Sequence, residues 1–274
     1  MYRSLAMLLP VAALLLITIC SNALAPIRMV RYTIPSSKIN GRVRIALIAD
    51  LHGSRYGRNQ TQLMDTLAKN QPDVVLLCGD IFDSAARKKQ AAAFINAVGA
   101  TYPCCFVFGN HEHASGRMNA IRQAVTNAGI TILEGDCLCF TANGQTIRIA
   151  GVDDAERNRR GCTEQLARVS IALAGAPEFS VLLAHQPQLI SQLLDTRAGL
   201  ILCGHTHGGQ WSIPRLLNGL YAPGQGLFPK YAGGSYAFGA QTLIISRGLS
   251  KFPLWAPRLF TPRELVLVDI VQES

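Results

Sequence analysis

The sequence predicts an α/β protein in which two packed β-sheets are covered by helices on their outer faces. Short apolar runs at residues 44–50, 73–80 and 103–110 have the near-continuous hydrophobicity of strands that are buried on both faces. Stretches with helical spacing separate these runs, as consecutive parallel strands require. A second series of strands and helices follows from residue 131 onward, which is enough for a second sheet in the same domain.

The chain begins with an uncharged stretch that separates Arg3 from Arg28. At about 1.5 Å per residue, a helix of this length can cross a hydrocarbon core of about 30 Å. We expect residues 1–27 to be an uncleaved transmembrane anchor; the alternative is a cleaved signal peptide with its cleavage box at residues 23–25. One cation precedes the stretch and five follow it, which predicts a cytoplasmic catalytic domain on the inner membrane, with export as the alternative.

Residues 28–41 carry proline, serine and basic residues, and we expect them to form a linker to a single domain at 42–274. Helices are expected at 60–70, 87–98 and 116–128, one after each of the first three strands. Consecutive short strands with a hairpin turn at Asn143–Gly144 follow. The remaining expected elements are helices near 163–174 and 187–194 and strands at 180–185, 199–205, 241–248 and 264–271. Residues 208–239 show no clear period.

Composition excludes several classes of protein. Hydrophobic residues make up 49% of the 274 residues, which excludes a disordered chain. Lys and Arg outnumber Asp and Glu by 26 to 17, yet no stripe of cations interleaved with aromatic residues accompanies the net charge of +9, so nucleic acid is disfavoured as a partner. Most of the eight cysteines fall in apolar runs, which is typical of buried thiols in a reducing compartment. Burial also argues against Cys105 or Cys203 as a nucleophile, because it raises a thiol pKa.

Polar clusters follow five of the predicted strands. Their members are Asp50 and His52, Asp80 and Asp83, Asn110 to Glu112, His185, and His205 and His207. In α/β sheets the carboxyl ends of the strands form the ligand-binding edge, so we expect these side chains to meet. Imidazole and carboxylate together suit Zn, Mn or Fe, and a set of this size exceeds one tetrahedral site and fits two divalent ions.

These clusters form a recognisable series of motifs: DLH at 50–52, GDIFD at 79–83, GNHE at 109–112, LLAHQP at 182–187 and GHTHGGQ at 204–210. In this order they resemble the motifs of the calcineurin-like metallophosphoesterases. With GVDD at 151–154 and SRG at 246–248, the chain is similar to the membrane-associated bacterial phosphodiesterases of that family. One departure is Pro262–Arg263–Glu264, where that subgroup tends to have Pro-Pro-Glu. The resemblance implies the two-sheet αββα sandwich of this family, here preceded by an N-terminal hydrophobic helix.

The resemblance also implies roles for individual residues. The ligands of two divalent ions, of Mn, Zn or Fe, would be Asp50, His52, Asp80, Asn110, His185, His205 and His207. Asp80 would bridge the two ions, and water activated between them would be the nucleophile. His111 would stand over the phosphate as the general acid. Asp83 and Asp154 are expected either to orient histidines or to cap local structure.

The function that follows is hydrolysis of phosphodiester or pyrophosphate bonds. An anchored enzyme of this type suits a membrane-surface or lipid-linked substrate such as UDP-2,3-diacylglucosamine, from lipid A synthesis. The alternatives are a phosphomonoesterase or phosphoprotein phosphatase, and a non-catalytic scaffold with the same fold. The apolar side chains of residues 208–239 follow the last motif. They are expected either to form an acyl-chain groove or membrane contact, or to pack on the sheet edge.

Overall fold

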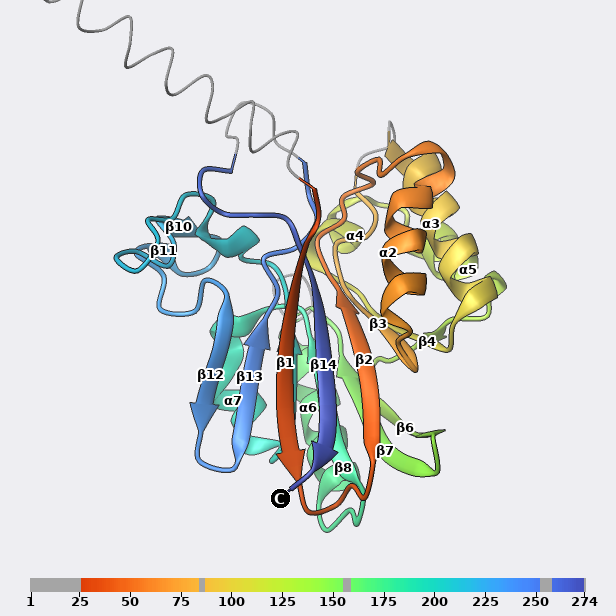
Figure 1. Ribbon diagram of the computed structural model, residues 1–274, viewed down its shortest axis with the longest axis vertical. Helices are drawn as coiled ribbons and strands as arrows, with labels where there is room; N and C mark the ends of the chain where they lie inside the picture. The colour runs from red at the N-terminus through yellow and green to blue at the C-terminus, as the bar shows by residue number, and fades with distance from the viewer. Residues whose placement is uncertain (1–25, 84–86, 155–158, 252–257, 274) are drawn as a thin grey trace, which may run out of the picture.

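Two six-stranded sheets lie face to face in the computed structural model, which describes residues 26–83, 87–154, 159–251 and 258–273 (Figure 1). Helices cover the outer face of each sheet, so the order of layers is helix, sheet, sheet, helix. Both sheets are mixed, because each combines parallel and antiparallel neighbours. The predicted α/β class with two packed sheets is therefore confirmed.

The first sheet has a parallel centre. Its strands, in spatial order, are β1 (Arg28–Ser36), β14 (Glu264–Gln272), β2 (Arg42–Ile48), β3 (Val74–Cys78), β4 (Cys104–Val107) and β5 (Thr131–Ile132). Strands β2 to β5 run parallel, whereas β14 is antiparallel to β2. The strands β3 and β4 are buried at every position, which explains their uninterrupted apolar sequence.

The second sheet also has a parallel centre, with an antiparallel strand at each edge. Its strands, in spatial order, are β12 (Gly234–Phe238), β13 (Gln241–Ile245), β9 (Leu200–Cys203), β8 (Phe179–Ala184), β7 (Gln145–Val152) and β6 (Asp136–Ala142). The hairpin between β6 and β7 turns at Asn143 and Gly144, both with positive φ (51° and 71°), as a two-residue hairpin turn demands. The predicted turn is thus confirmed.

Helices connect the parallel strands. Those on the first sheet are α2 (Thr61–Asn70), α3 (Lys88–Thr101) and α5 (Met118–Asn127), and those on the second are α6 (Arg159–Leu173) and α7 (Ile190–Asp195). The shorter elements are η1 (Arg58–Gln60), α4 (Asn110–Ala114), η3 (Pro187–Leu189), η4 (His207–Gly209), β10 (Tyr221–Ala222) and β11 (Gly226–Leu227). Residues 208–239, which have no sequence period, therefore contain three short strands.

The core has three apolar clusters, one between the sheets and one beneath each helical layer. The middle cluster joins residues of β2 and β3 to residues of β7, β8 and β9. This packing fixes the two sheets relative to each other, and with them the strand ends that carry the polar clusters.

The predicted linker at 28–41 is wrong, because residues 28–36 form β1. This strand pairs along its whole length with β14, at the other end of the sequence. Val30, Tyr32 and Ile34 alternate along it and pack on the cluster between the sheets. Arg31 and Thr33 at the intervening positions, with Pro35 after them, obscured this period of two. β1 is therefore part of the folded domain.

The predicted anchor falls mainly in residues 1–25, which lie outside the described residues. In the described ranges, no helix has the length and apolar character needed to cross a membrane.

Candidate metal centre

The five polar clusters meet at one end of the two sheets, which is the upper end in Figure 1. Asp50 and His52 follow β2, and Asp80 follows β3. The chain pairs beyond these strand ends: Asp50 N donates to Gly79 O (3.1 Å) and His52 N donates to Asp80 O (2.8 Å). Asp50 and Asp80 are thereby held side by side.

The second sheet supplies the other wall of the centre. His185 follows β8, and His205 and His207 follow β9. His205 N donates to both carboxylate oxygens of Asp50, at 3.0 Å each, which joins the strand ends of the two sheets. Asn110 comes from the start of α4, and its Oδ1 lies 3.0 Å from His205 Nδ1.

The backbone is strained where these side chains enter the centre. Five non-glycine residues of the predicted set have positive φ: Asp50 (51°), His52 (47°), Asp80 (55°), His205 (72°) and His207 (51°). This conformation costs an L-residue roughly 1–2 kcal/mol. Backbone strain of this kind concentrates at functional sites, where the surrounding structure keeps the residues in the strained conformation that places their side chains correctly.

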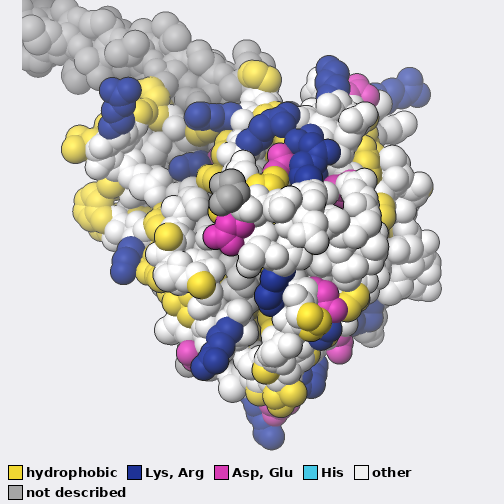
Figure 2. Space-filling view, turned by 60° about the horizontal axis from the view of Figure 1, so that its bottom comes forward, with side chains coloured by type: hydrophobic (Ala, Val, Ile, Leu, Met, Phe, Trp, Pro, Cys, Tyr) yellow, Lys and Arg dark blue, Asp and Glu magenta, His cyan; other side chains and the backbone are white. Residues whose placement is uncertain are grey.

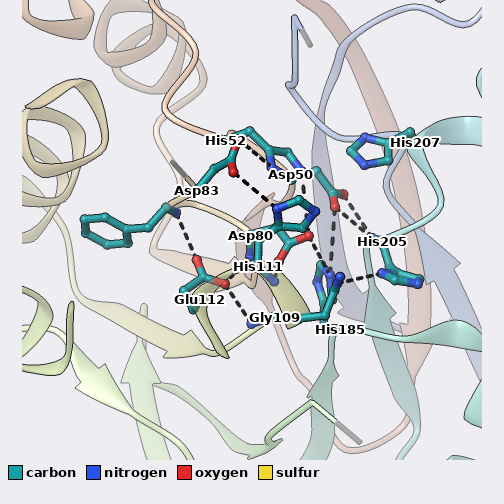
Figure 3. Close-up of polar contacts among 12 residues, drawn as sticks. Asp50, His52, Asp80, Asp83, Gly109, His111, Glu112, His185, His205 and His207 are labelled. Carbon is teal, nitrogen blue, oxygen red and sulfur yellow. Dashed lines mark hydrogen bonds and ion pairs between the residues drawn. The ribbon is translucent and has the colours of Figure 1, made fainter. Parts of the chain in front are cut away.

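Three groups of side chains have ligand atoms within 4.8 Å of one another (Figure 3). The first is Asp50, His52 and His207, and another is Asp80, His185 and His205. The third, His52, Asp80 and His111, overlaps both of the others. The arrangement therefore suits two neighbouring metal ions.

The donor atoms also fit metal ligation. The Nε2 atoms of His52, His185 and His205 are buried and have no hydrogen-bond partner among the described residues. His185 Nδ1 lies 2.8 Å from Cys78 O and donates its proton there. Its Nε2 points to Asp80 Oδ2 at 3.2 Å. Nε2 and the carboxylate are thus placed together where one cation can contact both.

The charges in the centre are strongly coupled. Burial opposes the charged form of His185, but the Asp80 and Asp50 carboxylates outweigh it and raise its pKa well above the ordinary value. Burial and the charge of His185 lower the pKa of His205 to about 3. Burial and the neighbouring His52 and Arg258 hold the pKa of His207 well below its ordinary value. His205 and His207 are therefore neutral at pH 7, which is the form that binds metals.

His111 stands at the mouth of the centre. Its side chain is 42% exposed, whereas those of Asp50 and Asp80 are buried. Its backbone N–H donates to Asp80 Oδ1 (2.9 Å), and its Nδ1 lies 3.3 Å from Asp83 Oδ1. The hydrogen bond with Asp83 raises the pKa of His111 to about 9 despite partial burial. His111 is thus protonated at neutral pH and accessible from solvent.

Asp83 orients histidines, which was one of its two expected roles. Besides His111, it approaches His52 Nδ1 at 3.8 Å and pairs with Arg87. Burial works against its charge, but the hydrogen bonds with these neighbours lower the pKa of Asp83. Asp154 is buried next to Asp153, and Asp153 pairs with His113 at 2.6 Å.

Sequence reasoning missed the role of Glu112. This fully buried carboxylate accepts backbone hydrogen bonds from Asp80 (2.8 Å), Phe82 (2.9 Å) and Gly109 (2.9 Å). Burial and the charge of Asp80 raise its pKa to about 8. Glu112 therefore ties the end of β3 to the end of β4. The sequence signal that could have indicated this role was a carboxylate in the GNHE motif, directly after a buried strand.

Sequence reasoning also missed Arg258, which lies far along the chain from the motifs. The guanidinium is buried, and its Nη2 lies 3.3 Å from His207 Nδ1. It also donates to the carbonyls of Arg247 and Gly248. No local pattern in the sequence marks this position.

The cysteines of the strands are unsuited to nucleophilic catalysis, as expected. Burial raises the pKa of Cys105 to about 12, and it raises the pKa of Cys203 as well. Both thiols therefore stay protonated at neutral pH.

Comparison with known proteins decides the family. Residues 43–209, more than half of the chain, match the calcineurin-like phosphoesterase family. The chain belongs to this family. It is thereby a metal-dependent phosphoesterase, and the three groups of Asp and His residues agree with the pair of metal ions that the family uses.

Relatives and solved structures agree with this assignment. The chain is 28% identical over 235 residues to the phosphodiesterase YaeI of Escherichia coli, covering 83% of this chain and 82% of that protein. It is 33% identical over 184 residues to the metallophosphoesterase F40B5.2 of Caenorhabditis elegans, covering 62% of this chain but only 38% of the worm protein. The fold is similar to that of a 5′-nucleotidase precursor from Thermus thermophilus (TM-score 0.53, 12% identity), over 84% of this chain and 54% of that one.

Proposed function

We propose that this calcineurin-like phosphoesterase hydrolyses phosphodiester or pyrophosphate bonds with two bound metal ions. In this assignment one ion would be held by Asp50, His52 and His207. The other would be held by Asn110, His185 and His205, and Asp80 would serve both. The observation that carries the proposal is the pair of neighbouring ligand groups. Each group combines residues that follow strands of the first sheet with residues that follow strands of the second. A carboxylate suits the bridging position because it offers two anionic oxygens to two cations.

The residues of the chain position the substrate and move one proton. Bound divalent ions supply a water of lowered pKa as nucleophile and neutralise the phosphoryl charge. His111 faces Asp83 through Nδ1, which leaves its Nε2–H free to donate to the departing oxygen. Asp83 keeps the imidazole of His111 oriented and charged. Glu112 holds Asp80 in place through the backbone.

The assignment of metal ligands is tested by metal content. The purified protein is stripped with a chelator, reconstituted with Mn, Zn or Fe, and analysed for bound metal per chain. We expect two ions in the unmodified protein and one in His207→Ala. The matched control is His113→Ala, which alters a histidine outside the three ligand groups and should retain two ions. Equal metal content in the two variants would refute the assignment of His207.

The bond specificity is tested with small substrates. We expect faster turnover of bis-p-nitrophenyl phosphate than of p-nitrophenyl phosphate in the reconstituted enzyme. The opposite preference would favour a phosphomonoesterase. The name of the relative YaeI, a phosphodiesterase, supports the first outcome.

We further propose that the substrate is lipid-linked and that the catalytic domain works at the cytoplasmic face of the inner membrane. The support is the uncharged stretch that precedes β1 and the exposed apolar side chains beside the centre. UDP-2,3-diacylglucosamine is the substrate to test first. Removing residues 1–25 should slow its hydrolysis in vesicles, because the anchor raises the local concentration. Hydrolysis of a small soluble diester is the control and should not change. Equal rates on vesicles would exclude a lipid-borne substrate.

A further inference from the structure

One face of the described structure carries most of its exposed apolar surface. Seven of the eight exposed large apolar side chains lie between Trp211 and Phe228 or at Phe260. Leu216 is 81% exposed and Leu227 66%. The chain around Phe260 runs beside residues 210–213, since Ser212 N donates to Leu259 O (3.0 Å) and Leu259 N donates to Gln210 O (3.1 Å). We call residues 211–228 together with Phe260 the apolar face.

Figure 2 shows hydrophobic side chains together with Lys and Arg side chains along the left-hand edge of the molecule, the side on which Figure 1 places β10 and β11. Soluble monomers rarely expose contiguous apolar surface of this kind unless it binds something. Alternation of apolar and cationic groups is typical of surfaces that meet anionic lipid.

A pocket of about 630 Å³ opens between this face and the edge strand β1. Its apolar wall includes Ile213, Leu216 and Phe260. Three arginines also line the pocket: Arg28 at the start of β1, Arg215, and Arg247. The pocket therefore combines cationic and apolar lining residues, as the headgroup and first methylenes of a phospholipid require.

The three guanidinium groups differ in their hydrogen-bond and ion-pair partners. Arg247 is fixed by Glu264 (3.1 Å) and by Asn218 (3.3 Å). In the described parts of the chain, the side chains of Arg28 and Arg215 have neither a hydrogen-bond nor an ion-pair partner. Two unpaired cations and one oriented cation thus face the same cavity. Guanidinium groups in such an arrangement suit a phosphate, which can accept several hydrogen bonds at once.

The position of the pocket connects it with the membrane and with the metal centre. Arg28 directly follows the uncharged stretch in the sequence and begins β1 at the end of the sheet where the centre opens. Arg247 packs beside Gly208, the residue after His207, because a Cβ added at Gly208 would lie 2.7 Å from the Arg247 side chain. A bilayer that held the first residues of the chain would therefore lie next to the pocket and the centre together.

From these observations we propose that the apolar face docks on an anionic phospholipid bilayer and that the pocket holds the phosphate of one lipid headgroup. The apolar side chains enter the boundary between headgroups and acyl chains, while Arg28, Arg215 and Arg247 surround the phosphate. This docking concerns the orientation of the domain on the membrane. It does not depend on which bond the metal centre hydrolyses, so its failure leaves the proposed hydrolysis untouched.

The test uses the single tryptophan of the apolar face in the full-length protein. The chain has two tryptophans, so Trp255→Phe leaves Trp211 as the reporter. The probe is a vesicle of equal parts phosphatidylcholine and phosphatidylglycerol, with bromine on the upper part of the acyl chains as a quencher. We expect the emission of Trp211 to shift to the blue and to be quenched. The matched control places a tryptophan at the exposed Ile171, at the far end of α6, in the Trp211→Phe, Trp255→Phe background; it should remain unquenched.

The headgroup site is tested by removing the two unpaired cations. Each cation near an anionic surface contributes about 1 kcal/mol, so Arg28→Gln with Arg215→Gln should lower the ratio of docked to undocked protein by as much as roughly 30-fold. Thermal unfolding and bound metal check that this variant is folded. Independently of any variant, high salt should reduce the quenching of Trp211.

Three results would overturn the proposal. The first is absence of quenching in anionic vesicles. The second is equal quenching in vesicles of phosphatidylcholine alone, which would remove the role of the arginines. The third is a blue shift that rises with protein concentration without vesicles, which would make the face an interface between two copies of the chain.

Discussion

Gly248→Ala should disturb the metal centre from outside the ligand set. Gly248 lies in the turn after β13, with φ at +69°. Its backbone runs against Asp50: a Cβ at this position would lie 2.5 Å from the Asp50 Cβ and 2.7 Å from Oδ2. The neighbouring Leu249 N donates to Asp50 O (3.2 Å), so the two segments cannot easily separate. A single methyl group must therefore displace the carboxylate.

The size of the effect follows from two contributions. Alanine in the left-handed region costs roughly 1–2 kcal/mol. Overpacking a tightly filled site costs about 1–3 kcal/mol more. Gly116 separates the two contributions, because its φ is +66° but no described atom lies within 4 Å of its would-be Cβ. We expect Gly116→Ala to lose roughly 1–2 kcal/mol of unfolding free energy and Gly248→Ala to lose about 2–5 kcal/mol.

The assay has two readouts. Urea unfolding is measured on metal-free proteins, because bound metal would add its own stabilisation. Bound metal and turnover of bis-p-nitrophenyl phosphate are then measured after reconstitution. Moving a ligand by changing what supports it typically costs 10–100-fold in metal affinity or activity, and we expect a loss of about this size for Gly248→Ala. Gly116→Ala should keep its metal and its turnover.

One result would refute this reasoning. If the two variants lose equal stability and both keep normal metal content and turnover, the clash with Asp50 has no consequence. Displacing the Asp50 carboxylate would then affect neither metal binding nor turnover, which would contradict the assignment of Asp50 as a metal ligand.

Further predictions concern the other groups of the centre and the topology. Asp80→Asn should remove most bound metal and activity, because a neutral amide bridges two cations poorly; two metals per chain with near-normal turnover would contradict the bridging role. His111→Ala should keep both metals and lose turnover by roughly 10²–10⁴-fold, with a smaller loss for substrates that have good leaving groups, whereas loss of metal would make His111 a ligand. Alkaline phosphatase fused after Ser274 should be inactive if the domain is cytoplasmic, and an active fusion would show export.

The layered fold could be predicted because parallel strands buried on both faces leave a strong local signal. The runs that became β3 and β4 are apolar throughout, and each is buried throughout. The hairpin at Asn143 was also predictable, since few dipeptides adopt positive φ twice in succession. In these elements the local sequence and the tertiary environment favour the same secondary structure.

β1 could not be predicted in the same way. Its short alternation of Val30, Tyr32 and Ile34 is flanked by polar and basic residues and followed by Pro35, so the segment resembles a linker. It becomes a strand because β14, from the end of the chain, offers a partner along its whole length. An edge strand tolerates proline and exposed cations, since one side of it makes no ladder.

The sequence was enough to name the residues of the centre, because parallel strands of one sheet end at one edge and the motifs after these strands are distinctive. Asp50 and Asp80 follow strands of the first sheet, and His185 and His205 follow strands of the second. The facing of the two sheets and the way in which these residues are supported depend on the tertiary structure. Glu112 and Arg258 act through burial and through hydrogen bonds to segments distant in sequence, and neither leaves a local pattern. The exposure of the apolar face was likewise undecided, since an apolar side chain in an irregular segment packs inward or outward according to what the rest of the fold leaves uncovered.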